Sequence, residues 1–268
     1  MIPQVADLLE EGKELREFLA TLGESDFDRV TQFKDWTVND VVLHLHASDV
    51  QAIASATDAG AYLALRRDIV AKRATGLSPI EEARSRYPGI KGRRLLARWS
   101  EHLEQLCVLL AAKDPASRLQ WGGPDMGVRM FTTARQMETW AHGQAIYDLM
   151  AKERVVRPRI KNVAVIGVGT FGWTFTNRKL AVPSVAPYVR LISPAGEVWE
   201  WNTPARDNAV GGDAVEFCQV VTQVRNVADT RLAVTGDTAR RWMDIAQCFA
   251  GPPSDPPAPG TRYKASDE

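Results

Sequence analysis

Apolar side chains recur at helical spacing through most of the first 150 residues, and this pattern constrains the fold more than any other feature. Spacings of three and four residues place such side chains on one face of a helix, and that face must be buried. We expect four long helices, over about residues 5–22, from 37 onward, over 95–110 and over 131–150. Four long amphipathic helices with connections of varied length predict a four-helix bundle.

The signals in the second half of the chain are mixed. Residues 188–192 and 197–201 alternate like two strands, and the four residues between them are typical of a hairpin loop. Helices are expected over about 213–224 and 238–249. This combination predicts a small α+β domain.

The whole chain is therefore expected to be α+β, with a helical bundle followed by a smaller mixed domain. We place the bundle at residues 1–155 and the second domain at 156–250. The remaining stretch, 251–268, is rich in proline and is expected to be disordered.

Composition excludes several classes of protein. The 33 basic side chains balance the 33 acidic ones, which argues against binding nucleic acid or an anionic membrane by bulk charge. An odd number of cysteines without a C-x-x-C pair argues against a disulfide framework or a zinc finger, and we interpret Cys107, Cys218 and Cys248 as small buried apolar residues. We expect no signal peptide and no transmembrane helix, and hence a cytoplasmic protein.

Histidines and one glutamate form the most informative set of polar residues. Glu138 and His142 are four residues apart on the fourth predicted helix, so their side chains share a face. His44 and His46 lie on the second predicted helix, where the apolar stripe runs between them, so periodicity does not choose one of them as a partner. Imidazole and carboxylate groups together suit zinc or a similar divalent ion, although such pairs also occur on solvated helices. His102 is interpreted as structural.

Residues 167–172 match the G-x-G-x-x-G pattern of dinucleotide-binding proteins and follow a strand-like stretch, 163–166. The pattern needs a helix after the glycines and an acidic residue about 20 positions later. No good helix is expected after residue 172, and no acid stands near residue 190. We therefore interpret this segment as a tight glycine-rich connector between the domains.

A local excess of basic residues lies between Arg66 and Arg98. Such a cluster could attract a carboxylated substrate or an anionic thiol cofactor. A solvated helix face explains the same residues.

Two motifs resemble those of a known family. Residues 36–45 (WTVNDVVLHL) resemble the pattern W-x-V-x-D-x-x-x-H-L, and residues 135–144 (RQMETWAHGQ) resemble R-x-x-E-x-W-x-H-G. Both patterns belong to the DinB-like superfamily, and in particular to the mycothiol-dependent maleylpyruvate isomerase metal-binding domain family. Residues 194–201 and 246–251 resemble the C-terminal region of bacterial relatives, which is sterol-carrier-like.

This resemblance implies a ligand set, in which His44, Glu138 and His142 bind a divalent metal. Zinc is the metal implied first, with nickel or another ion as an alternative. The resemblance also implies a low-molecular-weight thiol as a further cofactor. No catalytic residue separate from the ligands is assigned. One departure is that Gln144-Ala145 stands where the family motif carries an acid, which puts the substrate in question.

The implied function is a metal-dependent enzyme that activates a small thiol for isomerisation or S-transfer on an electrophilic, carboxylated substrate. A monomer or a homodimer is expected, with small-molecule partners and neither nucleic acid nor membrane. Alternatives are a non-enzymatic metal- or ligand-binding protein and a nucleotide-dependent oxidoreductase that uses residues 167–172. The resemblance adds a tRNA-modifying protein, because relatives with the C-terminal stretch are sometimes labelled wyosine base formation proteins.

Overall fold

The computed structural model describes residues 2–123 and 125–265. The chain divides into two compact units, Met1–Ile146 and Tyr147–Glu268. The fold class is α+β, as the sequence predicts. The predicted domain boundaries, the disorder of the tail and the sterol-carrier likeness stay predictions.

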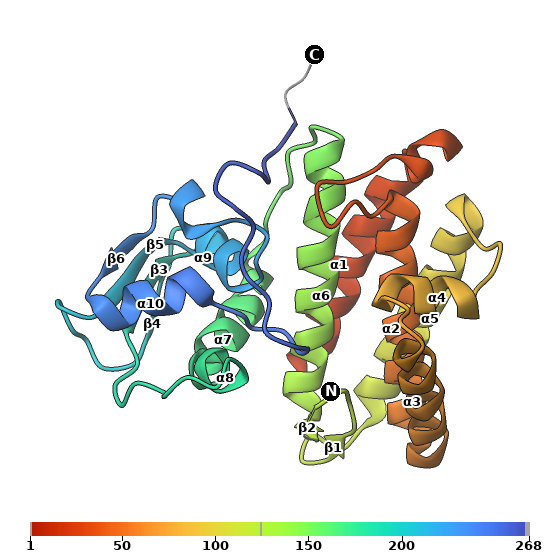
Figure 1. Ribbon diagram of the computed structural model, residues 1–268, viewed down its shortest axis with the longest axis horizontal. Helices are drawn as coiled ribbons and strands as arrows, with labels where there is room; N and C mark the ends of the chain where they lie inside the picture. Colours follow the sequence, from red (N-terminus) through yellow and green to blue (C-terminus); the bar gives the residue numbers. More distant parts are fainter. Residues whose placement is uncertain (1, 124, 266–268) are drawn as a thin grey trace. The chain divides into compact units, whose positions relative to one another are not determined.

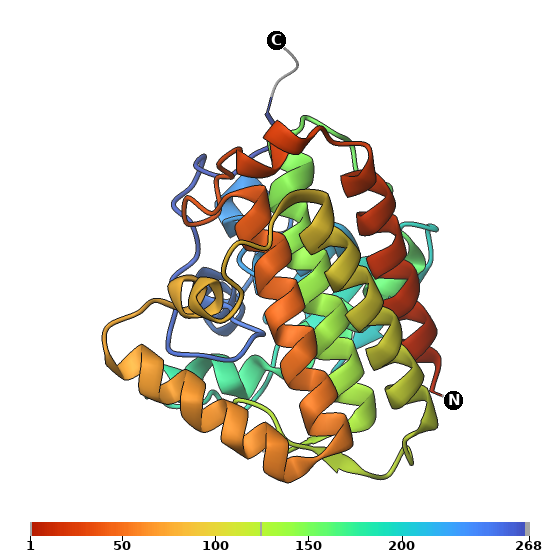
Figure 2. The ribbon, with the colours of Figure 1, turned by 90° about the vertical axis from the view of Figure 1, so that its right-hand side faces the viewer.

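The first unit is built around four long helices that lie side by side (Figures 1 and 2). Two shorter α-helices, a 3-10 helix and a two-stranded ribbon fill the connections between them. The elements up to the end of the bundle are α1 (Pro3–Ala20), the 3-10 helix η1 (Glu24–Asp28), α2 (Val38–Thr57), α3 (Ala59–Ala74), α4 (Pro79–Arg86), α5 (Gly92–Ala112), β1 (Arg118–Leu119), β2 (Met126–Gly127) and α6 (Val128–Leu149). The predicted four-helix bundle is therefore confirmed, with α1, α2, α5 and α6 as its helices.

The core of the bundle consists of the apolar stripes that define its helices. Its fully buried members include Leu8, Leu15, Leu45, Trp99 and Trp140. Leu8, Leu15, Leu45 and Trp99 belong to the apolar stripes of the sequence. Full burial of such a side chain stabilises the fold by roughly 1.5–3 kcal/mol, so these stripes are sufficient to hold the long helices together.

Helix α3 is the element of this unit that the sequence pattern does not reveal. Only Tyr62 and Ile69 of its 16 residues are buried. Leu63 and Val70 are exposed, so the apolar residues of α3 do not form one buried stripe. The helix is set instead by its start, where the side chain of Asp58 accepts hydrogen bonds from the backbone N–H groups of Gly60 and Ala61.

The second unit combines a four-stranded mixed sheet with short helices (Figure 1). Its strands lie in the order β4-β3-β5-β6; β3 pairs antiparallel with β4 and parallel with β5, and β5 pairs antiparallel with β6. The elements are η2 (Pro158–Ile160), α7 (Lys161–Gly169), α8 (Phe171–Asn177), β3 (Tyr188–Ile192), β4 (Val198–Trp201), β5 (Ala209–Asp213), α9 (Ala214–Val221), η3 (Val227–Asp229), β6 (Ala233–Thr235) and α10 (Asp237–Ile245).

The hairpin predicted near residue 195 is confirmed. Ser193 and Glu197 close the loop through a backbone hydrogen bond of 2.8 Å, and the register pairs Ile192 with Val198. Gly196 adopts φ of 82°, a conformation that favours glycine at this turn. The helices predicted over 213–224 and 238–249 are also present, although both are shorter than expected.

The interpretation of residues 163–172 as a strand followed by a tight connector is wrong. These residues form the two helices α7 and α8. Gly167 lies inside α7, and a Cβ there would come within 2.7 Å of Val221 and 3.1 Å of Phe217. Gly167 therefore allows α7 to approach α9 closely.

Residues 251–265 contain neither helix nor strand and follow the surface of the second unit through specific hydrogen bonds. The side chain of Gln223 donates to the carbonyl of Ser254 at 2.7 Å, and that of Asn226 donates to the carbonyl of Pro257 at 2.9 Å. Arg262 donates in turn to the carbonyl of Gln223.

Among the described residues, no helix is both long enough and apolar enough to cross a bilayer. The cytoplasmic location stays a prediction. Cys107, Cys218 and Cys248 are free thiols and are buried, as the sequence predicts.

Candidate metal centre

The first motif positions α2 by capping it. The hydroxyl of Thr37 accepts the N–H of Asp40, and the carboxylate of Asp40 accepts the N–H of Thr37 at 2.9 Å, which is a capping box. Arg84 on α4 donates two more hydrogen bonds to Asp40, at 2.8 and 2.6 Å. Burial alone would raise the pKa of Asp40, but the bonds from Arg84 and Thr37 outweigh it and lower that pKa. The start of α2, and hence the position of His44, is fixed by this network.

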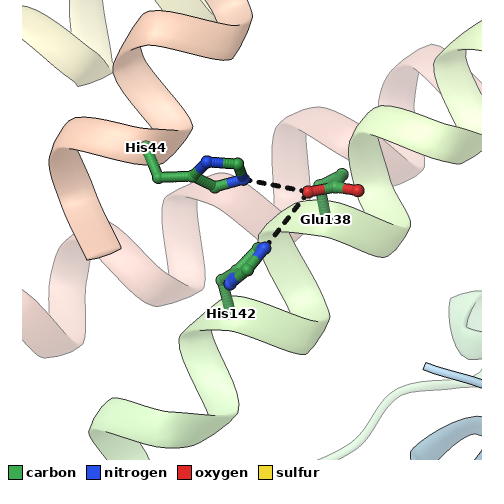
Figure 3. Close-up of side chains that lie close together, drawn as sticks. All are labelled: His44, Glu138 and His142. Carbon is green, nitrogen blue, oxygen red and sulfur yellow. Dashed lines mark hydrogen bonds and ion pairs between the residues drawn. The ribbon is translucent and has the colours of Figure 1, made fainter. Parts of the chain in front are cut away.

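The second motif lies on α6 and supplies two side chains one turn apart. Glu138 and His142 share a face of the helix, and His44 of α2 points toward them (Figure 3). The Nε2 atom of His44 lies 3.0 Å from Oε2 of Glu138, and Nε2 of His142 lies 3.2 Å from the same oxygen. Each of the three residues offers one ligand atom, and these three atoms all lie within 4.8 Å of one another.

Aromatic side chains support both imidazole rings. The Trp36 ring stacks on His142 with centroids 5.8 Å apart and planes at 11°, and it also contacts His44 at 5.4 Å. Phe33 meets His142 edge-on at 5.0 Å. Trp36 is the first residue of the first motif, so one short stretch of sequence supplies both the helix cap and a support for the rings.

The electrostatics of the cluster favour the protonation states that a metal requires. Burial, followed by the nearby His142, lowers the pKa of His44 to about 4. Burial acts to raise the pKa of Glu138, but hydrogen bonds from His142 and His44 outweigh it, and the pKa lies well below its usual range. At neutral pH His44 is therefore neutral and Glu138 is ionised, which are the ligand forms of imidazole and carboxylate.

The donor set fits a divalent ion of the zinc type. Two imidazole nitrogens and one carboxylate oxygen are the three protein ligands of many catalytic zinc sites, which keep a further position for water or substrate. The three side chains are only 26%, 21% and 15% exposed, so a ligand in that position would be largely shielded from solvent. A bound ion would replace the two hydrogen bonds to Glu138, because the nitrogens must give up their protons to coordinate it.

The structure separates His44 from His46, which the periodicity of the sequence does not. His46 is fully buried and contacts the rings of Tyr87 and His102, both at 4.8 Å between centroids. His102 donates from Nδ1 to the carbonyl of Arg98 at 2.8 Å. Within the described chain, the group of residues placed to hold a metal contains His44, Glu138 and His142, and neither of these other histidines belongs to it.

The basic stretch between residues 66 and 98 is divided among several roles. Arg84 binds Asp40, and Arg86 binds the fully buried Glu82 at 2.5 Å. Arg66 donates to the side chain of Gln51 on α2 at 3.4 Å. Arg84 and Arg86 therefore serve buried carboxylates, a use that neither sequence interpretation anticipated.

Sequence reasoning missed Asp49, which is also part of the framework around the site. Its carboxylate accepts hydrogen bonds from Arg135 on α6 and Trp99 on α5, both at 3.0 Å. The signal was present in the sequence, because Asp49 stands four residues after Leu45, within the apolar stripe of the second helix. A charged residue in such a stripe indicates a buried partner.

Fold and site together define a helical bundle with a His-Glu-His cluster on two of its long helices. The chain belongs to the mycothiol maleylpyruvate isomerase N-terminal domain family, whose model matches residues 8–147. This confirms the family that the two motifs indicate.

Two similar proteins match nearly the whole chain. Two proteins of Mycobacterium tuberculosis, from strains H37Rv and CDC 1551 and both described as uncharacterized, are each 32% identical over 251 residues. The match covers 94% of this chain and 96% of each relative. Two crystal structures of mycothiol-dependent maleylpyruvate isomerase, one of them a mutant, align with 82% of this chain and 88% of their own at 12% and 11% identity, with a TM-score of 0.49.

Proposed function

We infer that this protein is a divalent-metal-dependent enzyme that activates a low-molecular-weight thiol against a small, carboxylated electrophile. The observation that carries this proposal is the convergence of His44, Glu138 and His142 from the two motifs that indicate the family. Zinc is the ion that the donor set suits first. The family description supports mycothiol as the class of thiol.

The nucleophilic sulfur has to come from outside the chain, because the protein's own thiols are placed against such a role. Burial raises the pKa of Cys107 to about 12 and that of Cys218 well above its usual value. Cys248 is only 4% exposed. None of the three cysteines belongs to the group of ligands described above.

The chemistry needs a thiolate and an electron-poor double bond. A bound divalent metal lowers the pKa of a thiol, so that the nucleophilic thiolate forms at neutral pH. Addition of a thiolate to a double bond conjugated with a carbonyl moves the electron pair onto that carbonyl and leaves a single bond, which rotates. Expulsion of the same thiolate restores the double bond in the trans form. Protonation of the adduct would instead retain the new C–S bond and give S-transfer.

Five residues would have defined roles in this scheme. His44, Glu138 and His142 would hold the ion, and Trp36 and Phe33 would keep the two imidazoles in place. The presence of Gln144-Ala145 where the family motif carries an acid supports a substrate other than the one for which the family is named. For this reason the proposal specifies a reaction class and leaves the substrate open.

The test combines metal analysis with thiol titration. We expect purified protein to contain about one equivalent of divalent metal, and cobalt-substituted protein to change its visible spectrum when mycothiol or cysteine is added. Conversion of any cis substrate found in a panel of small carboxylated electrophiles should then require both metal and thiol. A cobalt spectrum that no thiol changes would favour the non-enzymatic metal-binding alternative, and protein without stoichiometric metal would contradict both.

A further inference from the structure

A buried ion pair joins the two helices that carry the candidate ligands. Asp49 lies five residues after His44 on α2, and Arg135 lies three residues before Glu138 on α6. The Nε atom of Arg135 donates to Oδ1 of Asp49 at 3.0 Å. The two residues are only 1% and 8% exposed, so this contact lies inside the bundle.

The same carboxylate also binds a third helix. Oδ2 of Asp49 accepts the indole N–H of Trp99, which is fully buried on α5. Burial raises the pKa of Asp49, while the charge of Arg135 and the hydrogen bonds from Arg135 and Trp99 oppose that rise. One side chain therefore fixes the positions of α2, α5 and α6 relative to one another.

This arrangement is a poor way to gain stability alone. Replacing a buried ion pair with apolar residues of similar size is often neutral or stabilising, because the desolvation of two charges offsets their attraction. The pair here is also incompletely satisfied, since Nη2 of Arg135 is buried with no hydrogen-bond partner among the described residues. A directional contact, however, sets the register of two helices in a way that apolar packing does not.

The position of the pair suits a role in register. Asp49 and Arg135 meet next to the point where α2 and α6 bring His44 to within 3.0 Å of Glu138. Arg135 is the first residue of the second motif and takes no part in the ligand set. A shift of either helix by even part of a turn would separate ligands that must meet within about 2 Å of one ion.

We propose that Asp49 and Arg135 are positioning residues of the metal centre, whose ion pair holds α2 and α6 in the register that brings His44 to Glu138 and His142. This inference rests on the proposed metal site. It predicts that the pair affects metal affinity and ligand geometry separately from its effect on stability. Groups that hydrogen-bond metal ligands change affinity by about 10- to 100-fold when they are altered, and we expect a pair that sets the register of both ligand helices to act on the same scale.

The test replaces the ion pair with a neutral one. The double variant Asp49→Asn/Arg135→Gln removes both buried charges, so it avoids an unpaired ion, and it retains an acceptor for Trp99. We expect it to fold, to bind Co²⁺ about 10- to 100-fold more weakly than the wild type, and to show altered d–d bands. If it does not fold, Arg135→Lys keeps the charge but moves the donor, and the same changes are expected in that variant.

A matched control exists in the same unit. Glu82 and Arg86 also form a buried ion pair, but both residues lie on α4 and neither helix with ligands takes part. The variant Glu82→Gln/Arg86→Gln should lose stability while its Co²⁺ affinity and spectrum stay those of the wild type. Thermal unfolding by circular dichroism separates stability from metal binding in both variants.

Each outcome of these binding experiments leads to a different conclusion. Wild-type affinity and spectrum in both the Asp49→Asn/Arg135→Gln and Arg135→Lys variants would overturn the inference and leave the metal site intact. Equal weakening in the Glu82→Gln/Arg86→Gln control would also overturn it, because the effect would then be general loosening. Absence of Co²⁺ binding in the wild type would overturn the proposed function itself.

Discussion

Helix α2 carries two histidines only two residues apart, and each belongs to a different polar cluster. His44 meets the carboxylate of Glu138 and the imidazole of His142. His46 meets the rings of Tyr87 and His102, and its electrostatic neighbours His102, Arg98 and Arg86 all disfavour a charged imidazole. The pKa of each histidine is lowered to about 4, first of all by burial.

The comparison shows that burial alone does not make a metal ligand. Both imidazoles are neutral at physiological pH, so both have a lone pair available for coordination. What distinguishes the His44 cluster is an anionic oxygen and a second imidazole within ligand distance. A neutral histidine surrounded by cations and aromatic rings is instead a packed core residue, which explains the role of His46.

The largest expected effect is the loss of the carboxylate that sets the two clusters apart. Glu138→Gln keeps the shape of the side chain but removes its charge, so we expect Co²⁺ affinity to fall by more than about 100-fold, beyond the range for residues behind the ligands. Isothermal titration calorimetry measures this fall. Gln144→Ala, two residues after His142, is the control and should stay within about two-fold of the wild type. Comparable losses in the two variants would contradict the assignment of Glu138.

The second prediction compares alanine substitutions of the two histidines of α2. His46→Ala leaves a void in the core and should lower the free energy of unfolding by about 2 kcal/mol while Co²⁺ affinity is unchanged. His44→Ala should have the opposite pattern, because His44 is 26% exposed and forms part of the ligand set. Urea unfolding and calorimetry on the same samples measure both quantities. A loss of metal binding in His46→Ala without unfolding would show that the clusters are not separate.

Much of the fold was accessible from the sequence, for a physical reason. The stripes of the long helices bury one face each, and a period near 3.6 records that burial in the sequence. Strand β5 was missed because Gly211 and Gly212 are unfavourable in strands and give no alternation. Helices α7 and α8 are not evident from the sequence because glycines are unfavourable in helices, and the close packing that Gly167 allows is a tertiary property.

The candidate site was only partly accessible, because its geometry depends on contacts between distant segments. Residues 44 and 138 are 94 positions apart. Periodicity placed Glu138 beside His142, but it could not choose which of His44 and His46 is their partner, because the apolar stripe of α2 runs between these two histidines. The choice came from the family resemblance. The Asp49–Arg135 contact also joins segments far apart in the sequence, so the sequence alone did not reveal it.

The third prediction uses pH to separate the two clusters. The pKa of His46 falls from 6.5 to about 4 on folding, so between these values the unfolded chain binds a proton that the folded chain does not. This contribution to stability is full above pH 6.5 and is lost as the pH falls toward 4. In urea unfolding, the wild type should lose about 2 kcal/mol more than His46→Gln between pH 7.5 and pH 5.

The control for this measurement is the metal. Co²⁺ competes with protons at His44 but has no contact with His46, so added Co²⁺ should leave the difference between the wild type and His46→Gln unchanged. A difference that disappears when Co²⁺ is added would connect His46 to the metal centre.

The smallest expected effect concerns the aromatic support of each cluster. Trp36→Phe replaces the stacked ring on His142 with a smaller one, and aromatic contacts of this kind are worth about 0.5–1.5 kcal/mol, so Co²⁺ affinity should fall by roughly three- to ten-fold. Tyr87→Phe keeps its ring against His46 and should leave Co²⁺ affinity unchanged. Each variant alters a ring that contacts a histidine. A comparison of their Co²⁺ affinities therefore tests whether aromatic support affects metal binding only at the ligands. Weaker binding in Tyr87→Phe than in Trp36→Phe would mean that the two clusters of α2 are mechanically coupled.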